Sequence, residues 1–360
     1  MIPIADPDVG DAEIQAVREA MESGSLACGE RVKQFQSEFA AYCGADYGVA
    51  TTNGTTALHA ALHALGIGPG DRVVTTPFSF VATANAVRLV GAEPVFADID
   101  PETYNLDPDA VEAIVREGDV DAILAVHLFG LPADMGRLAE IADEYDLWLI
   151  EDAAQAHAAE FEGRKVGSFG DAACFSFYPT KNMTTGEGGM VLTPHEDVAD
   201  RVQRFIDHGR TQGYEHGSVG HNFRLTDMAA AIGRVQLERL PEFTRARRAN
   251  AARLTEALAD APVVTPIEPA GYTHVYHQYT VRCADRDALQ AHLADHGVTA
   301  GVYYPLTIPD QPAYAGYDAD VPEARRAAEE VLSLPVHPHV SAEDIETITA
   351  ALRSFYAIPS

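Results

Sequence analysis

The feature that most constrains the fold of this chain is an alternation of short β-rich runs with helical stretches between Tyr47 and Thr193. Two of the intervening stretches, Thr55 to Leu65 and Met135 to Tyr145, repeat apolar residues at helical spacing. Such alternation predicts a doubly wound, largely parallel sheet with functional groups at the strand ends. The β-rich runs lie at residues 48–50, 72–75, 94–97, 122–126, 147–150 and 174–177.

A second block of the chain follows a long helical stretch from Leu225 to Leu258, which we expect to be interrupted near Pro241. This block has a strand-like run at residues 277–281 and helical patterns at 286–296 and 342–356. We place a domain boundary near residue 245. The sequence therefore predicts a large domain at residues 1–245, N-terminal segment included, and a smaller C-terminal α+β domain at 246–360.

The charge of the chain is strongly acidic, with 25 basic and 54 acidic residues and a net charge of −29. Nucleic-acid binding requires Lys and Arg to neutralise phosphates, so this class of partner is disfavoured. The acidic residues are spread along the chain, and only three lysines occur. Molar salt screens such self-repulsion, so we expect a halophilic source, an archaeon in our interpretation. An ordinary acidic protein is the alternative.

The chain shows no sign of a membrane protein or of secretion. No apolar run approaches the roughly 20 residues that a membrane span needs. The first residues, Met1 to Asp6, do not resemble a signal peptide. The four cysteines, Cys28, Cys43, Cys174 and Cys283, are widely spaced, which suits a reducing compartment. We therefore expect a cytoplasmic protein without a membrane partner.

Lys181 is the first candidate for a catalytic residue. It follows a predicted strand, in a turn rich in Gly, Thr and Ser that runs to Gly189. A lysine placed there reaches into a cleft, and its amine becomes a Schiff-base nucleophile when its pKa is lowered. Ser176, five residues earlier, offers a hydroxyl to a phosphate. The alternative is a surface lysine beside a turn.

Asp152 ends an apolar run and places a carboxylate at the carboxyl edge of the predicted sheet. Such a carboxylate can pair with the ring nitrogen of pyridoxal phosphate and keep it protonated. Gln155 could hydrogen-bond the phenolic oxygen of the same ring. A carboxylate–histidine metal site on Asp152, Gln155 and His157 is the less favoured alternative, and we expect no metal.

A polar turn at residues 51–54 opens an apolar helix, so the N–H groups at Thr55 and Thr56 form an anion site suited to a phosphate. Capping of this helix by Asn53 or Thr55 is compatible with that role. Phe80 lies in a strand-to-helix connection and could stack on the pyridine ring. Taken alone, Phe80 fits a core residue better.

These motifs resemble the DegT/StrS family of nucleotide-sugar aminotransferases over nearly the whole chain. The resemblance implies the fold-type I aminotransferase architecture, with a mostly parallel seven-stranded sheet in the large domain. It is carried in order by segments 24–30, 53–58, 126–130, 151–157, 167–171, 176–189, 220–227 and 334–338. His221 departs from the usual Tyr of the family and Ala158 from the usual Gly.

The resemblance implies a role for each matching residue. Lys181 would carry pyridoxal phosphate as a Schiff base, and Asp152 would contact its pyridinium. The matching motif at 220–224 usually completes the site from a neighbouring subunit, which implies a homodimer with shared active sites. The remaining cofactor contacts would be Thr55, Thr56, Phe80, Gln155, Ser176, Asn222 and Arg224, with either Asn222 or Arg224 on the phosphate. Candidate substrate contacts are His157, Tyr178, Tyr303, Tyr304 and His337.

The implied reaction transfers an amino group from an amino acid, L-glutamate by resemblance, to a nucleotide-linked 3- or 4-keto-hexose. The product would serve surface polysaccharide or glycan biosynthesis. The dehydratase relatives carry His in place of the lysine, so Lys181 argues against dehydration. Amination of a keto-cyclitol stays open, and so does a regulator of the same fold that binds cofactor or sugar without turnover.

Overall fold

The computed structural model describes residues 1–358. A seven-stranded sheet forms its centre, in the order β1-β9-β8-β5-β4-β2-β3. The neighbouring strands from β3 to β8 run parallel, and β9 is antiparallel to both of its neighbours. The predicted fold-type I sheet is therefore confirmed. The strands are β1 (Tyr47–Thr51), β2 (Arg72–Thr75), β3 (Glu93–Phe96), β4 (Ala122–Val126), β5 (Trp148–Asp152), β8 (Ala172–Ser176) and β9 (Gly189–Thr193).

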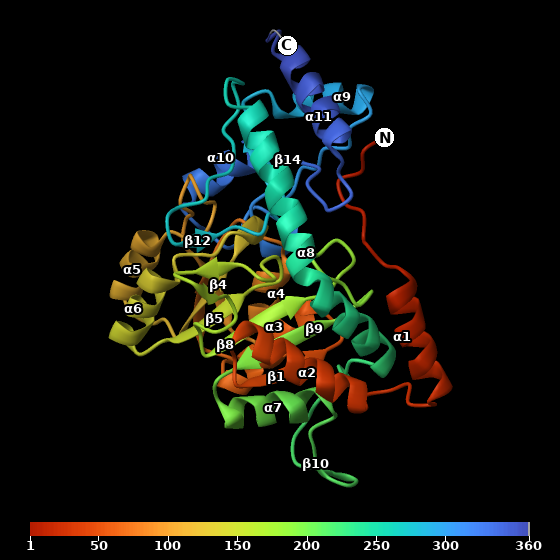
Figure 1. Cartoon of the computed structure of the whole chain (residues 1–360). Coiled ribbons are helices and arrows are strands. Elements are labelled where there is room, and N and C mark those ends of the chain that lie inside the picture. Colours follow the sequence, from red (N-terminus) through yellow and green to blue (C-terminus); the bar gives the residue numbers. More distant parts are fainter. Residues whose placement is uncertain (359–360) are drawn as a thin grey trace.

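Helices cover both faces of this sheet because successive residues of each central strand face opposite sides (Figure 1). Leu124 packs with one helical layer, whereas Ile123 and Ala125 pack with the other. The first layer contains α3 (Gly54–Leu65), α4 (Ala82–Leu89) and α7 (Glu196–Ile206). The second contains α2 (Glu30–Cys43), α5 (Pro108–Arg116), α6 (Met135–Tyr145) and the first half of α8 (Asp227–Ala257).

The long helix α8 corrects one prediction. It runs without a break from Asp227 to Ala257, although Pro241 lies inside it. Proline removes one amide donor from the helix, and the buried apolar side chains on either side, among them Leu240 and Phe243, hold the two halves in one element. The domain boundary predicted near residue 245 falls inside α8, which is continuous there. This domain boundary therefore stays a prediction.

A separate apolar core forms around the second half of α8. It is built from β13 (Tyr279–Arg282), β14 (Val331–Leu334), α9 (Arg286–Asp295) and α11 (Ala342–Phe355). Ile2 packs against this core and pairs with Val298, so the chain begins beside its C-terminal block (Figure 1). The remaining elements are α1 (Asp11–Glu22), β6 (Glu160–Phe161), β7 (Arg164–Lys165), β10 (Arg210–Gln212), β11 (Glu215–His216), β12 (Tyr272–Thr273), α10 (Pro322–Glu330) and the 3₁₀ turns η1 (Leu128–Gly130) and η2 (Pro312–Tyr314).

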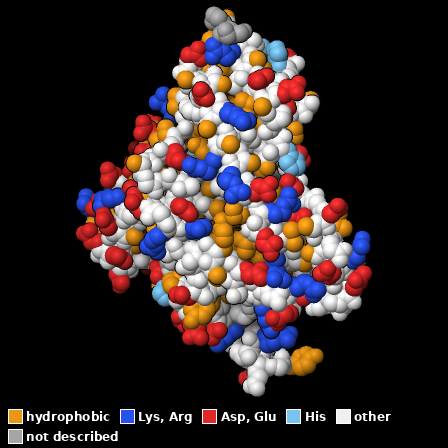
Figure 2. Space-filling model, viewed as in Figure 1, with side chains coloured by type: hydrophobic (Ala, Val, Ile, Leu, Met, Phe, Trp, Pro, Cys, Tyr) orange, Lys and Arg blue, Asp and Glu red, His pale blue; other side chains and the backbone are white. Residues whose placement is uncertain are grey.

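Acidic side chains are scattered over the face shown in Figure 2 rather than gathered in one patch. At a net charge of −29, their mutual repulsion opposes the compact state wherever salt does not screen it. We therefore expect the melting temperature to rise steadily between dilute buffer and KCl on the order of 1 M. A melting temperature that stays constant over this range would refute the halophilic interpretation and leave the fold untouched.

None of the helices within residues 1–358 is both apolar enough and long enough to cross a bilayer.

Candidate active site

A cavity of about 710 Å³ opens at the carboxyl ends of the parallel strands. Its wall combines residues from β5, β8, the start of α3, the turn after β8 and the distant segments around residues 278 and 303. This is the edge where the alternating pattern predicted functional groups. Ten of the predicted site residues line the cavity: Thr55, Thr56, Phe80, Asp152, Gln155, Ser176, Tyr178, Lys181, Tyr303 and Tyr304.

Asp152 is the last residue of β5, and its side chain is buried. The hydroxyl of Thr83 donates a hydrogen bond to Oδ2 at 2.8 Å, and the amide of Ala154 donates to Oδ1 at 3.2 Å. Burial raises the pKa of Asp152, while these donors and the charge of Lys181 act in the opposite direction. A buried carboxylate held in this way is suited to pair with a cation brought by a ligand.

Lys181 lies in the turn after β8, where its amide donates to the carbonyl of Tyr178 at 2.9 Å. Burial lowers its pKa to about 8, and the negative charge of Asp152 partly opposes this shift. At pH 7 roughly one amine in ten is then neutral, far more than for an ordinary lysine. The amine of Lys181 is thus prepared to act as a nucleophile and as a base.

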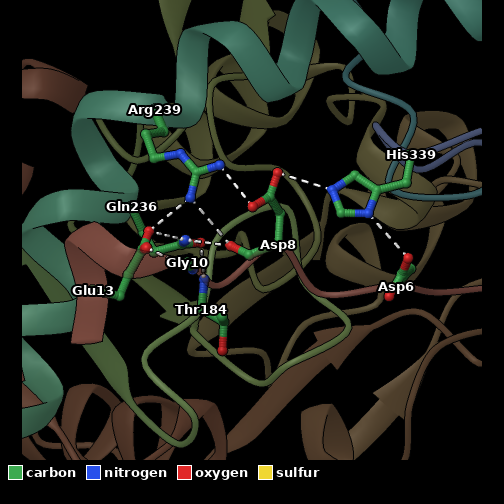
Figure 3. Close-up of polar contacts among 8 residues, drawn as sticks. All are labelled: Asp6, Asp8, Gly10, Glu13, Thr184, Gln236, Arg239 and His339. Atoms are coloured by element: carbon green, nitrogen blue, oxygen red, sulfur yellow. Dashed lines mark hydrogen bonds and ion pairs between the residues drawn. The ribbon is translucent and has the colours of Figure 1, made fainter.

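The far end of the Lys181 turn is held by the N-terminal segment and α8 (Figure 3). The side-chain oxygen of Gln236 accepts a hydrogen bond from the amide of Thr184 at 3.3 Å, and its nitrogen donates to Glu13 at 2.7 Å. Arg239 binds both Glu13 and Asp8, at 2.8 and 2.7 Å. His339 in turn contacts Asp8 and Asp6. Residues far apart in the sequence thus support the turn that carries the lysine.

The start of α3 lies directly against Ser176. Asn53 caps the helix, because its Oδ1 accepts from the amide of Thr56 at 2.9 Å while the hydroxyl of Thr56 accepts from the amide of Asn53 at 3.1 Å. A Cβ on Gly54 would lie only 2.8 Å from Cβ of Ser176, so glycine permits this close approach. The helix N-terminus, Thr55 and the Ser176 hydroxyl together form one cradle for an anion.

Gln155 already has partners for both ends of its amide. Its Oε1 accepts from the amide of Phe129 at 2.8 Å, and its Nε2 donates to the hydroxyl of Tyr304 at 2.7 Å. The contact of Gln155 with a cofactor ring oxygen therefore stays a prediction. Phe80 has 59% of its surface exposed and lines the cavity, so its reading as a core residue is wrong.

A model of the DegT/DnrJ/EryC1/StrS aminotransferase family matches residues 7–353. This chain belongs to that family.

Similar proteins support the assignment over nearly their full length. The chain is 44% identical to a pleiotropic regulatory protein of Geobacillus stearothermophilus, covering 95% of this chain and 94% of that one. It is 39% identical to a UDP-N-acetyl-3-dehydro-α-D-glucosamine 3-aminotransferase of Acidithiobacillus ferrooxidans, covering 95% and 93%. The crystal structure of S. venezuelae DesV in complex with a ketimine intermediate superposes with a TM-score of 0.93 at 37% identity, covering 97% and 95%.

Three motifs of the aminotransferase family meet in one buried network beneath the site. Glu151 accepts hydrogen bonds from the ring of His127 and from the amides of Gly167, Phe169 and Gly170. Burial alone would raise the pKa of Glu151, but these donors outweigh it and the pKa is lowered. This network therefore fixes the ends of β4 and β5, in addition to the site residues that the same motifs carry. The three motifs lie at 126–130, 151–157 and 167–171.

Two predicted substrate contacts lie away from the cavity of this aminotransferase. His157 is fully buried among Phe39, Phe175 and Phe177, and burial lowers its pKa to about 3. His337 is also buried, and its Nε2 lies 3.0 Å from the carbonyl oxygen of Pro3. In a single chain, neither side chain is placed to touch a sugar in this cavity.

No residue of the motif at 220–224 lines the cavity of its own chain, although the backbone of the motif pairs with Thr51 and Thr52 just before α3. Arg224 forms an ion pair with Asp207. Asn222 is exposed, and its backbone pairs with that of Asp207. Of the two candidates for the phosphate contact, Asn222 is therefore the one whose side chain is available to another subunit.

Proposed function

We propose that this aminotransferase transfers an amino group from an amino acid, L-glutamate as donor, to a nucleotide-linked keto-hexose for the synthesis of a surface polysaccharide or glycan. The observation that carries the proposal is the arrangement of Lys181, Asp152 and the anion cradle of Thr55, Thr56 and Ser176 around one cavity. The name of the relative from A. ferrooxidans supports a nucleotide-linked 3-keto-sugar as the acceptor.

The site residues fit pyridoxal phosphate. The phosphate needs an anion site, which the start of α3 and Ser176 provide. A protonated ring nitrogen needs a carboxylate, which Asp152 provides, and the exposed face of Phe80 suits stacking on the ring. Pyridoxal phosphate, when bound, supplies an aldehyde that condenses with amines and a ring that withdraws electrons from the adjacent carbon.

The protein itself contributes attachment, orientation and proton transfer. Lys181 would attach the cofactor and, once displaced by the amino donor, take a proton from the α-carbon of that donor through its Nζ. Its lowered pKa keeps enough neutral amine for this step near neutral pH. Thr83 and the amide of Ala154 orient the Asp152 carboxylate, which would keep the nitrogen of a bound cofactor ring protonated. Tyr178, Tyr303 and Tyr304 border the remaining space, where the sugar would lie.

We further propose a cytoplasmic homodimer. Cys43, Cys174 and Cys283 are buried free thiols whose pKa burial raises, a state that suits a reducing compartment. Among the described residues, Lys181 is the only Lys or Arg that lines the cavity. A cofactor phosphate and a nucleotide diphosphate, however, both require hydrogen-bond donors. A partner subunit that brings Asn222 to the phosphate would supply one of them.

The acceptor can be identified by a screen of UDP-, dTDP- and GDP-linked 3- and 4-keto-sugars with L-glutamate, with the amino sugar detected by mass spectrometry. We expect one of these sugars to gain an amine in stoichiometric exchange for 2-oxoglutarate. A matched keto-cyclitol in the same screen tests the competing reaction, which is amination of a cyclitol. Amination of the cyclitol alone would overturn the proposed substrate class.

A further inference from the structure

The residue directly after the catalytic lysine is anchored to a segment more than 90 positions further along the chain. Asn182 is 4% exposed, and its Nδ2 donates a hydrogen bond to the carbonyl of Val275 at 3.2 Å. Its Oδ1 lies 3.2 Å from Nδ1 of His277. Both contacts come from one short segment before β13. Neither Asn182 nor His277 is among the candidate site residues predicted from the sequence.

These two contacts define the protonation of the histidine ring. Because the amide nitrogen of Asn182 faces a carbonyl, its oxygen faces His277, and an amide oxygen only accepts. Nδ1 of His277 must therefore carry the proton. Burial lowers the pKa of His277 well below its ordinary value, and the positive charges of Lys181 and Arg247 act in the same direction. The ring is thus a neutral donor.

The segment that carries His277 is itself rigidly held. The amide of Val275 donates to the carbonyl of Gly130 at 3.0 Å, and the amide of Gln278 donates to that of Phe129 at 3.1 Å. Gly130 has φ +96°, and a Cβ there would lie 2.8 Å from the amide nitrogen of His277. The buried guanidinium of Arg247 donates to the carbonyl of Tyr276 at 3.2 Å. The histidine therefore offers a fixed point to the lysine turn.

The amine of Lys181 depends on such a fixed point. In residues 1–358 no carboxylate lies within 4.0 Å of its Nζ, and the residue's one hydrogen bond runs from its backbone amide to Tyr178. The position of the amine is therefore set by the backbone of its turn, not by a side-chain partner. Asn182 holds that backbone immediately after the lysine, and Thr184 holds it two residues further on.

We propose that His277 is a positioning residue for Lys181: its protonated Nδ1 fixes Asn182, and Asn182 fixes the lysine turn against the cavity. His277 also lines this cavity, so the anchor and the amine share one wall. The inference rests on the proposed function only for its effect on turnover. The placement of the amine can be measured without cofactor or sugar.

The test uses three substitutions of similar size in the cofactor-free protein. His277→Asn keeps a donor near the position of Nδ1, His277→Gln moves it to the position of Nε2, and His277→Leu removes it. The pKa of Lys181 is measured from the pH dependence of its acetylation, followed by peptide mass spectrometry. Because the chain has only three lysines, Lys33 and Lys165 serve as internal references in every sample.

We expect a pKa of about 8 in the wild type and in His277→Asn, since both fix Asn182. In His277→Leu and His277→Gln the turn loosens and water reaches the amine, so the pKa should rise by about one unit or more toward its ordinary value. Asn182→Leu should raise the pKa at least as far, because it removes the contact with Val275 as well as the contact with His277. Combining it with His277→Leu should add nothing beyond Asn182→Leu alone.

The proposal is overturned if His277→Leu leaves the pKa of Lys181 unchanged, or if His277→Asn shifts it as far as His277→Leu does. Melting curves identify any variant that fails to fold. If His277→Leu fails to fold, His277→Gln still tests the proposal, because the same rise in pKa is expected for it. In the loaded enzyme, kcat should fall roughly 10- to 100-fold in the glutamine variant with little change in KM. A shifted pKa in a protein that aminates no sugar would refute the proposed function and leave this inference standing.

Discussion

Lys181→Ala should lose amino transfer almost completely, while the protein keeps its fold. A positioned general acid–base group contributes roughly 10²- to 10⁴-fold to a rate, and this lysine is also the proposed point of cofactor attachment. The fold should survive because the amine forms no ion pair within residues 1–358 and is costly to bury in its charged form. Turnover with glutamate and the melting temperature are the two measurements.

Lys165→Ala is the matched control for this prediction. Lys165 lies 3.5 Å from Glu160 and 5.0 Å from the ring of Tyr42, outside the cavity wall. A partly exposed pair of this kind is worth at most about 1 kcal/mol of stability, so activity should be preserved. Reduction of the loaded enzyme with borohydride should label the peptide of Lys181. A label on Lys33 or Lys165, or activity of Lys181→Ala within tenfold of the wild type, would contradict the assignment.

Mixing two inactive variants should restore activity if the sites are shared between subunits. The cofactor phosphate carries close to two negative charges, and a helix N-terminus offers only about half a compensating charge. Asn222 is exposed and absent from the cavity of its own chain, so it is available to a partner. Asn222→Asp would place a repelling charge at that phosphate and leave the Arg224–Asp207 pair in place.

Lys181→Ala and Asn222→Asp are therefore expected to be inactive alone and to complement each other. A mixed dimer has one site with neither lesion, so subunit exchange in equal amounts should restore about a quarter of wild-type activity. The exchange itself is followed by native mass spectrometry with one subunit tagged, and each variant incubated alone is the control. Mixed dimers that form and stay inactive would show that each chain completes its own site.

The parts of the site that the sequence predicted share a physical origin. Asp152 and Ser176 end apolar strands, and the carboxyl ends of parallel strands meet at one edge of a sheet. Thr55 opens a helix that follows directly from another strand of the same sheet. Lys181 comes only five residues after Ser176. Local pattern and sheet topology were therefore enough to bring these side chains to one cavity.

The parts that the sequence did not predict depend on single contacts between distant residues. The bond between Gln155 and Tyr304 joins residues 149 positions apart, and the contact of His277 with Asn182 joins residues 95 apart. No periodicity encodes such a pair. His157 follows Asp152 closely in the sequence, yet the turn after β5 directs its ring into the aromatic core rather than the cavity. Similarly, Pro241 is a reliable break in an isolated helix, whereas tertiary packing keeps α8 continuous.

The most direct test of the central claim is the half-reaction of the loaded enzyme with L-glutamate in the absence of any keto-sugar. It separates an enzyme from a cofactor-binding regulator, a distinction that cofactor binding alone does not make. If Lys181, Asp152 and the anion cradle form an aminotransferase site, each subunit should release one equivalent of 2-oxoglutarate in a single burst, and Lys181→Ala should release none. A fully loaded wild-type protein that releases no 2-oxoglutarate, and no other 2-oxo acid from any amino donor tested, would contradict the assignment of this site to amino transfer.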